Sequence, residues 1–182
     1  MKLYFCDLPK LFTFLKPVAI WDEGGNRRYT LKNDESLTHA GYRLHLMDSA
    51  YEEVALIRQK LLTLTPRFYV DINGEERLVS LRRSLKGKSY FEVSGTDWKT
   101  EGDVDQWEYE IRAGDRSIAF VHASQARKKA CADAMNYLAS AVTSAPRTFS
   151  KENCCEIDIS DGIDEAEVLA VILAAVAAID VR

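Results

Sequence analysis

The sequence predicts a mainly β (α+β) fold, a closed antiparallel β-barrel of about twelve strands around a central hydrophobic C-terminal α-helix. The segment from Val168 to Ile179 is apolar without interruption, and a helix that is apolar on all sides must be enclosed. It is shorter than the roughly 20 residues of a membrane span, so we expect the protein itself to enclose it. Short alternating segments fill most of the remaining chain, and a large sheet made of hairpins avoids exposed edges by closing on itself.

Length and composition favour one domain over residues 1–182, because 47% of the residues are hydrophobic and 10% are aromatic. The net charge of −4 argues against a broad basic surface for nucleic acid. Asp7, Pro9 and Lys10 interrupt the apolar start before a signal peptide could form. We therefore expect a soluble, cytoplasmic protein without a transmembrane span. Its cysteines are expected to be reduced thiols, because no Cys-x-x-Cys spacing occurs.

A repeat of about 22 to 26 residues runs from Leu11 to about Gly95. Each copy has an alternating segment, a turn and a second alternating segment, which is the pattern of a β-hairpin. The turns contain Gly24-Gly25-Asn26, Asp48 or Asn73-Gly74, and Asn-Gly is a strong hairpin signal. The expected strands include Val18 to Trp21, Tyr29 to Leu31, Arg43 to Leu46, Val54 to Ile57, Phe68 to Ile72 and Leu78 to Leu81.

The second half continues this pattern, with strands expected at Ser89 to Val93, Trp107 to Ile111, Ser117 to Val121 and Glu156 to Ile159. The charged segment from Thr96 to Gln106 is expected to be a surface loop. Apolar residues recur at helical spacing between Ala126 and Ser144, which predicts an extra surface helix within an insertion over 126–146. Asp164, followed by Glu167 three residues later, predicts the cap of the central helix over 164–180.

Two segments resemble the LURP-one-related family: Ile57 to Asp71 with the Asn73-Gly74 hairpin, and Asp161-Gly162-Ile163-Asp164 leading into Leu169 to Asp180. The likeness extends from about Leu11 to Asp180. Members of that family are similar in fold to the tubby C-terminal domain and to phospholipid scramblases. The resemblance therefore implies a tubby-like, twelve-stranded barrel threaded by its C-terminal helix. The chain departs from the family pattern at Ala126 to Pro146, where members have a short strand segment rich in Lys and Phe.

A cluster of cations is the clearest candidate ligand-binding site. The cations fall in two neighbouring hairpins, which could bring them to one rim, and Arg and Lys side chains suit phosphate oxygens. The simpler interpretation is that they are solvated, outward-facing positions. The six candidate residues for a phosphate or headgroup are Lys60, Arg67, Arg82, Arg83, Lys86 and Lys88.

No other motif indicates catalysis, a metal or a cofactor. The three histidines, His39, His45 and His122, have no spacing typical of metal ligation. The acidic residues around Asp164 lack the alternate-residue oxygen pattern of a calcium loop, and helix capping explains them better. We therefore expect no catalytic residues, no metal and no cofactor.

The sequence thus favours a non-enzymatic binding module over an enzyme. Its expected ligand is an anionic, phosphate-bearing group, such as the headgroup of an anionic phospholipid or phosphoinositide at a membrane surface, which would make the protein peripheral there. Tubby domains bind phosphoinositide headgroups through basic residues, but a shared fold does not fix function. The alternative is a protein–protein interaction scaffold that uses the inserted helix.

Overall fold

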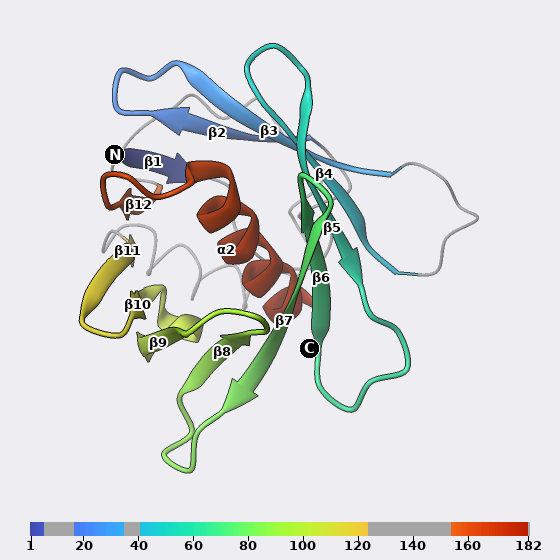
Figure 1. Ribbon diagram of the computed structural model, residues 1–182, viewed down its shortest axis with the longest axis vertical. Coiled ribbons are helices and arrows are strands. Elements are labelled where there is room, and N and C mark those ends of the chain that lie inside the picture. The colour runs from blue at the N-terminus through green and yellow to red at the C-terminus, as the bar shows by residue number, and fades with distance from the viewer. Residues whose placement is uncertain (6–16, 35–40, 124–153, 182) are drawn as a thin grey trace, which may run out of the picture.

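The chain forms a closed, twelve-stranded antiparallel β-barrel around a central helix in the computed structural model (Figure 1). The structure describes residues 1–5, 17–34, 41–123 and 154–181. Around the barrel the strands follow the order β1-β12-β11-β10-β9-β8-β7-β6-β5-β4-β3-β2, and β2 closes onto β1. The elements are β1 (Lys2–Phe5), β2 (Val18–Asp22), β3 (Arg27–Asn33), β4 (Arg43–Met47), β5 (Glu53–Gln59), β6 (Arg67–Ile72), β7 (Glu75–Arg83), β8 (Ser89–Val93), β9 (Trp98–Asp103), the 3₁₀ helix η2 (Val104–Gln106), β10 (Glu108–Ala113), β11 (Arg116–Ala123), β12 (Cys155–Ile159) and α2 (Glu165–Asp180).

The hairpins that the sequence predicts are confirmed. In the β6–β7 hairpin, Ile72 pairs with Glu75 across the Asn73-Gly74 turn, as the Asn-Gly signal indicates. Phe68, Val70 and Ile72 of β6 face the interior and are buried, whereas the alternate residues Arg67 and Tyr69 are half-buried. The period-two pattern of the sequence thus separates an inner apolar face from an outer polar face.

Helix α2 fills the barrel, as Figure 1 shows. Every residue from Val168 to Ala178 is at most 1% exposed. The helix packs most closely against β5, β6 and β7. Its many alanines allow the strands to approach, because a closed barrel leaves limited volume for side chains inside it. The prediction of a central hydrophobic helix is therefore confirmed.

Two described strands are missing from the sequence prediction. The segment from Thr96 to Gln106 was expected to be a surface loop, but it contains β9 and the helical turn η2, so that prediction is wrong. Strand β1 occupies the apolar start of the chain and pairs with β12 and β2. These two strands bring the total to twelve.

The expectations for the inserted helix and for the cysteines have different outcomes. The surface helix expected over 126–144 lies outside the described residues. Within the described residues, α2 is the single α-helix. Cys154 is disulfide-bonded, so the expectation of reduced thiols is wrong for this residue. Cys155 is free and fully buried. No helix of the described segments is long and apolar enough to cross a membrane.

Candidate functional site

The six candidate cations belong to two hairpins that lie next to each other in the barrel. Lys60 and Arg67 flank the β5–β6 loop, and the other four lie at the end of β7 and in the β7–β8 turn. The Leu81 amide donates a 3.1 Å hydrogen bond to the Pro66 carbonyl, which continues the β6–β7 ladder past the start of β6. The β5–β6 loop therefore ends beside the last part of β7. Both loops project at the lower side of Figure 1.

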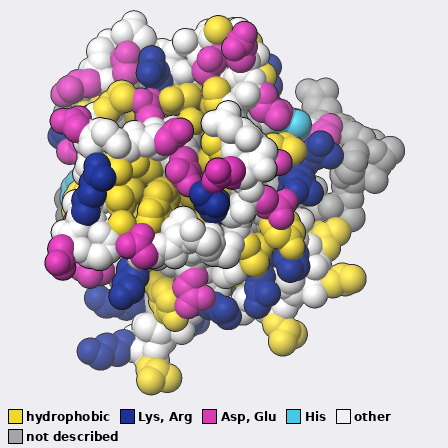
Figure 2. All heavy atoms as spheres, in the orientation of Figure 1, with side chains coloured by type: hydrophobic (Ala, Val, Ile, Leu, Met, Phe, Trp, Pro, Cys, Tyr) yellow, Lys and Arg dark blue, Asp and Glu magenta, His cyan; other side chains and the backbone are white. Residues whose placement is uncertain are grey.

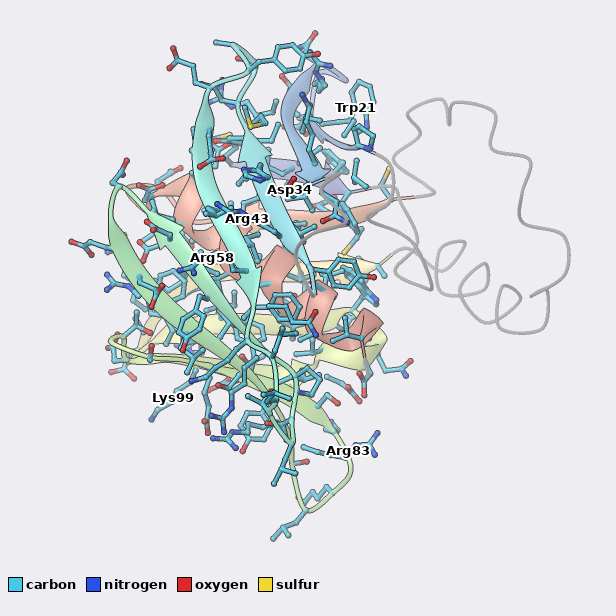
Figure 3. The ribbon with its side chains drawn as sticks, turned by 90° about the vertical axis from the view of Figure 1, so that its right-hand side faces the viewer. Trp21, Asp34, Arg43, Arg58, Arg83 and Lys99 are labelled. Atoms are coloured by element: carbon cyan, nitrogen blue, oxygen red, sulfur yellow. The ribbon has the colours of Figure 1, made fainter. Side chains whose placement is uncertain are left out.

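Arg82 differs from the other candidates because it already has a carboxylate partner. Its Nε lies 3.1 Å from Glu92 Oε2 on the outer face of the sheet. Arg58, one hairpin away, is similarly paired with Glu76 at 2.5 Å. These pairs balance charge along the outside of the strands, where Figure 3 shows Arg58. An anion that bound Arg82 would have to compete with Glu92.

Arg83, Lys86 and Lys88 have exposed side chains and form no ion pair with any described residue. Arg83 is the last residue of β7, and Lys86 and Lys88 lie in the tight turn that follows, which local hydrogen bonds close. The Gly87 amide donates to the Ser84 carbonyl at 2.9 Å, and Gly87 adopts a φ of +82°. That left-handed conformation favours glycine and is typical of a hairpin loop with a bulge. Figure 3 shows Arg83 projecting away from the barrel near this turn.

Lys60 and Arg67 face each other across the start of the β5–β6 loop. The Lys60 amide donates a 2.8 Å hydrogen bond to the Arg67 carbonyl. The Lys60 Nζ lies 5.2 Å from the centre of the Tyr69 ring, a cation–π arrangement, and it forms no ion pair with a carboxylate of the described segments. The buried Arg67 Nε has no hydrogen-bond partner within the described residues. We call Lys60, Arg67, Arg83, Lys86 and Lys88 together the cationic rim.

The same two loops carry exposed leucines, which are not among the site residues predicted from the sequence. Leu62, Leu64 and Leu85 have relative exposures of 105%, 107% and 110%, so their side chains contact almost nothing. Figure 2 shows hydrophobic side chains projecting at the lower edge of the molecule, with dark-blue Lys and Arg side chains between them. We call these three residues the leucine tips. The run Leu61-Leu62-Thr63-Leu64 between Lys60 and Pro66 was the available sequence signal, but apolar residues ordinarily indicate a core.

The two described histidines are engaged in contacts with carboxylates. His45 is paired with Glu53, and His122 Nδ1 lies 2.8 Å from Glu108 Oε1. His39 lies outside the described residues. Within the described segments, no group of three His, Cys, Asp or Glu side chains could hold a metal ion.

The acidic residues around Asp164 serve the beginning of α2. Asp164 Oδ1 accepts a 3.1 Å hydrogen bond from the Glu167 amide. Arg28 Nε lies 3.3 Å from Glu165 Oε1, and Arg77 Nε lies 3.5 Å from Glu167 Oε1. The Glu165 side chain hydrogen-bonds to Arg28 and so raises the pKa of that guanidinium. Carboxylates in the first turn also suit the helix dipole, so this cluster anchors α2 to β3 and β7.

The described architecture defines a class of protein: a closed antiparallel barrel of twelve strands built around a buried C-terminal helix. The chain belongs to the LURP-one-related family, whose model matches residues 9–176. It is 27% identical over 106 residues to the "Uncharacterized protein YxjI" of Bacillus subtilis. That match covers 58% of this chain and 64% of the Bacillus protein.

The fold is also similar to the X-ray structure of a protein from Arabidopsis thaliana. The TM-score is 0.54 at 16% sequence identity, and the match covers 94% of this chain and 88% of the Arabidopsis chain. At this identity the likeness concerns the fold alone. The family membership predicted from the sequence is confirmed.

Proposed function

We propose that the protein is a non-enzymatic binding module that recognises an anionic, phosphate-bearing ligand, such as a phospholipid headgroup at a membrane surface, through the cationic rim. What carries the proposal is the arrangement of Arg83, Lys86 and Lys88, three exposed cations without an ion pair in the described chain. Several other arginines of the described sheet, such as Arg58 and Arg112, are matched by carboxylates, whereas these three cations fall within six residues of one turn. A local excess of positive charge favours a multiply charged anion.

Lys60 and Arg67 extend this positive surface onto the neighbouring hairpin. The unpaired Arg67 Nε is a donor without an acceptor within the described chain, and an unpaired buried donor costs free energy. Because that Nε is buried, a phosphate oxygen would bind the other nitrogens of the Arg67 guanidinium group, where a charge-assisted hydrogen bond is strong. The scaffold alternative relies on residues 126–144, which lie outside the described structure, so no structural observation favours it.

The test removes three charges from the β7–β8 turn in the variant Arg83→Ser/Lys86→Ser/Lys88→Ser. Cosedimentation would compare binding to phosphatidylcholine vesicles with and without phosphatidylserine. Each basic side chain near an anionic surface contributes about 1 kcal/mol, so affinity for anionic vesicles should fall on the order of a hundredfold. Folding stability should change little, because these positions are on the surface.

A matched control removes three exposed cations elsewhere, in the variant Arg27→Ser/Lys99→Ser/Arg116→Ser. Its net charge changes by the same amount, so general electrostatic attraction falls equally. We expect this control to bind anionic vesicles far better than the turn variant. Equal losses in the two variants would show that only overall charge matters, and retained binding by the turn variant would exclude this rim as the site.

A further inference from the structure

The leucine tips are unusual because the rest of the described chain buries its large hydrophobic side chains efficiently. Seven large hydrophobic side chains are exposed in the described structure, and four of them, Leu61, Leu62, Leu64 and Leu85, belong to the two hairpin loops of the cationic rim. Three of these four have relative exposures above 100%. Exposed apolar side chains gathered at one end of a molecule indicate an interaction site.

The β5–β6 loop has its own hydrogen bonds, which hold its leucines outward. Thr63 Oγ1 lies 2.7 Å from the Thr65 carbonyl oxygen and 3.3 Å from the Lys60 carbonyl oxygen. Leu62 has a φ of +56°, a left-handed conformation that is uncommon for a side chain of this size. Thr63 therefore turns inward while Leu62 and Leu64 on either side project into solvent.

The β7–β8 turn presents Leu85 in the same way. The Lys88 amide donates a 3.1 Å hydrogen bond to Ser84 Oγ, and the Ser84 amide donates a 2.8 Å hydrogen bond to the Lys88 carbonyl. These bonds close the turn and leave Leu85 at its apex beside Lys86. Each loop thus carries both leucines and cations: Lys86 follows Leu85 directly, and Lys60 and Arg67 flank the loop that holds Leu62 and Leu64.

This combination fits a bilayer surface better than a protein surface. A protein interface has a closely packed apolar core, whereas the leucine tips stand on two separate loops that also carry cations. An anionic bilayer offers phosphates that attract cations, together with an apolar layer beneath that accepts projecting side chains. Asp105 belongs to η2, between β9 and β10 at the same end of the barrel. Its carboxylate accepts a 2.6 Å hydrogen bond from Ser89 Oγ and is therefore engaged in a protein contact.

We infer that Leu62, Leu64 and Leu85 insert into an anionic phospholipid bilayer while the cationic rim binds its headgroups. This inference rests on the proposed function and adds that the phosphate belongs to a membrane lipid. The barrel would dock with the β5–β6 and β7–β8 loops toward the membrane. The opposite end, which carries the β2–β3, β4–β5 and β6–β7 turns, would face away from it.

The first experiment uses the variant Leu62→Ser/Leu64→Ser/Leu85→Ser, which keeps every charge. Moving a leucine from water into an apolar medium changes an equilibrium constant by about tenfold or more. Cosedimentation with phosphatidylserine-containing vesicles should therefore weaken at least about tenfold. Binding of soluble inositol hexakisphosphate, measured by calorimetry, should remain unchanged because the cations are intact. Circular dichroism would verify that the variant folds.

The second experiment measures insertion directly. Tryptophan replaces Leu85 in one variant and Ser49, an exposed residue of the β4–β5 turn at the opposite end, in a control. Vesicles containing phosphatidylserine and a phosphatidylcholine with brominated acyl chains quench only tryptophans that reach the bilayer. We expect additional quenching for Leu85→Trp relative to the unmodified chain and none for Ser49→Trp.

The outcomes separate this inference from the proposed function. Vesicle binding that survives the serine substitutions, without quenching of Leu85→Trp, would overturn insertion and leave the cationic rim as a headgroup site. Binding of inositol hexakisphosphate without vesicle binding would overturn the membrane docking and assign the phosphate to a soluble ligand. Failure to bind either probe would overturn both proposals.

Discussion

Tyr109 places a hydroxyl group in the apolar interior of the barrel. Its side chain is 2% exposed, and its ring packs edge-on against Phe91 with ring centres 5.8 Å apart. The hydroxyl has no hydrogen-bond partner within the described residues. A buried hydroxyl without a partner costs free energy, because it loses its hydrogen bonds to water on folding.

We therefore predict that Tyr109→Phe leaves the free energy of unfolding unchanged or raises it by up to about 1 kcal/mol at neutral pH. Chemical denaturation would measure the difference. Tyr29→Phe serves as the control, because the Tyr29 hydroxyl is hydrogen-bonded to Glu165. Loss of that bond should lower stability by about 1 kcal/mol. A clear destabilisation by Tyr109→Phe would mean that its hydroxyl has a partner.

The same substitution should change the response to alkaline pH. Burial raises the pKa of Tyr109 well above its ordinary value. Above a pH of about 10 the unfolded chain loses this proton while the folded chain retains it, so stability falls as pH rises. Tyr109→Phe removes this contribution, and the loss of stability above pH 10 should become less steep. An unchanged slope would contradict the buried, protonated state.

The elements differ in how far their sequences predict them. The alternation between Phe68 and Ile72 predicts strand β6, and the structure confirms it with one more residue at its start, Arg67. Strand β9 has no fully buried residue, and its sequence, Trp98–Asp103, has no apolar alternation. Its pairing with β10 depends on Gly102, where an added Cβ would lie 2.4 Å from the Glu108 carbonyl oxygen. Only the neighbouring strand reveals this requirement.

Helix α2 begins at a cap that its own sequence specifies. The Asp164 carboxylate accepts a hydrogen bond from the Glu167 amide, which would otherwise lack an intrahelical partner. We predict that Asp164→Ala lowers the free energy of unfolding by about 1 kcal/mol. Asp164→Ser should retain most of that stability, because its hydroxyl can accept the same bond. Equal losses for Ala and Ser, measured by urea denaturation, would argue against capping.

The whole molecule depends on α2, because the inner faces of the strands have no other described core to pack against. Leu169, Ile172 and Leu173 are fully buried among them. We predict that a chain ending at Asp164 shows no cooperative thermal transition by circular dichroism. Each buried aliphatic side chain contributes about 1.5 to 3 kcal/mol, and the helix as a whole exceeds the net stability of about 5 to 15 kcal/mol typical of domains.

A point substitution gives a graded version of the same test. Ile172→Ala should cost about 2 to 5 kcal/mol, because it leaves a cavity in the centre of the barrel. A truncated chain with an unchanged thermal transition would contradict the role of α2 as the core. An Ile172→Ala variant as stable as the original protein would contradict the tight packing around the helix.

The sequence by itself determined the central helix, its cap and the principal hairpins, because these depend on local periodicity, turn residues and the need to enclose an apolar helix. Tertiary structure decided what depends on distant partners. The sequence does not predict strand β1 because its residues Leu3, Tyr4 and Phe5 are all apolar and show no alternation. Tyr4 is buried beside Cys154, apart from the main core. The cations predicted as a site divide into Arg82, which Glu92 pairs, and those of the rim. Leu62, Leu64 and Leu85 lie between expected strands, but leucine is typical of a core, and only the tertiary structure shows that the described residues leave all three exposed.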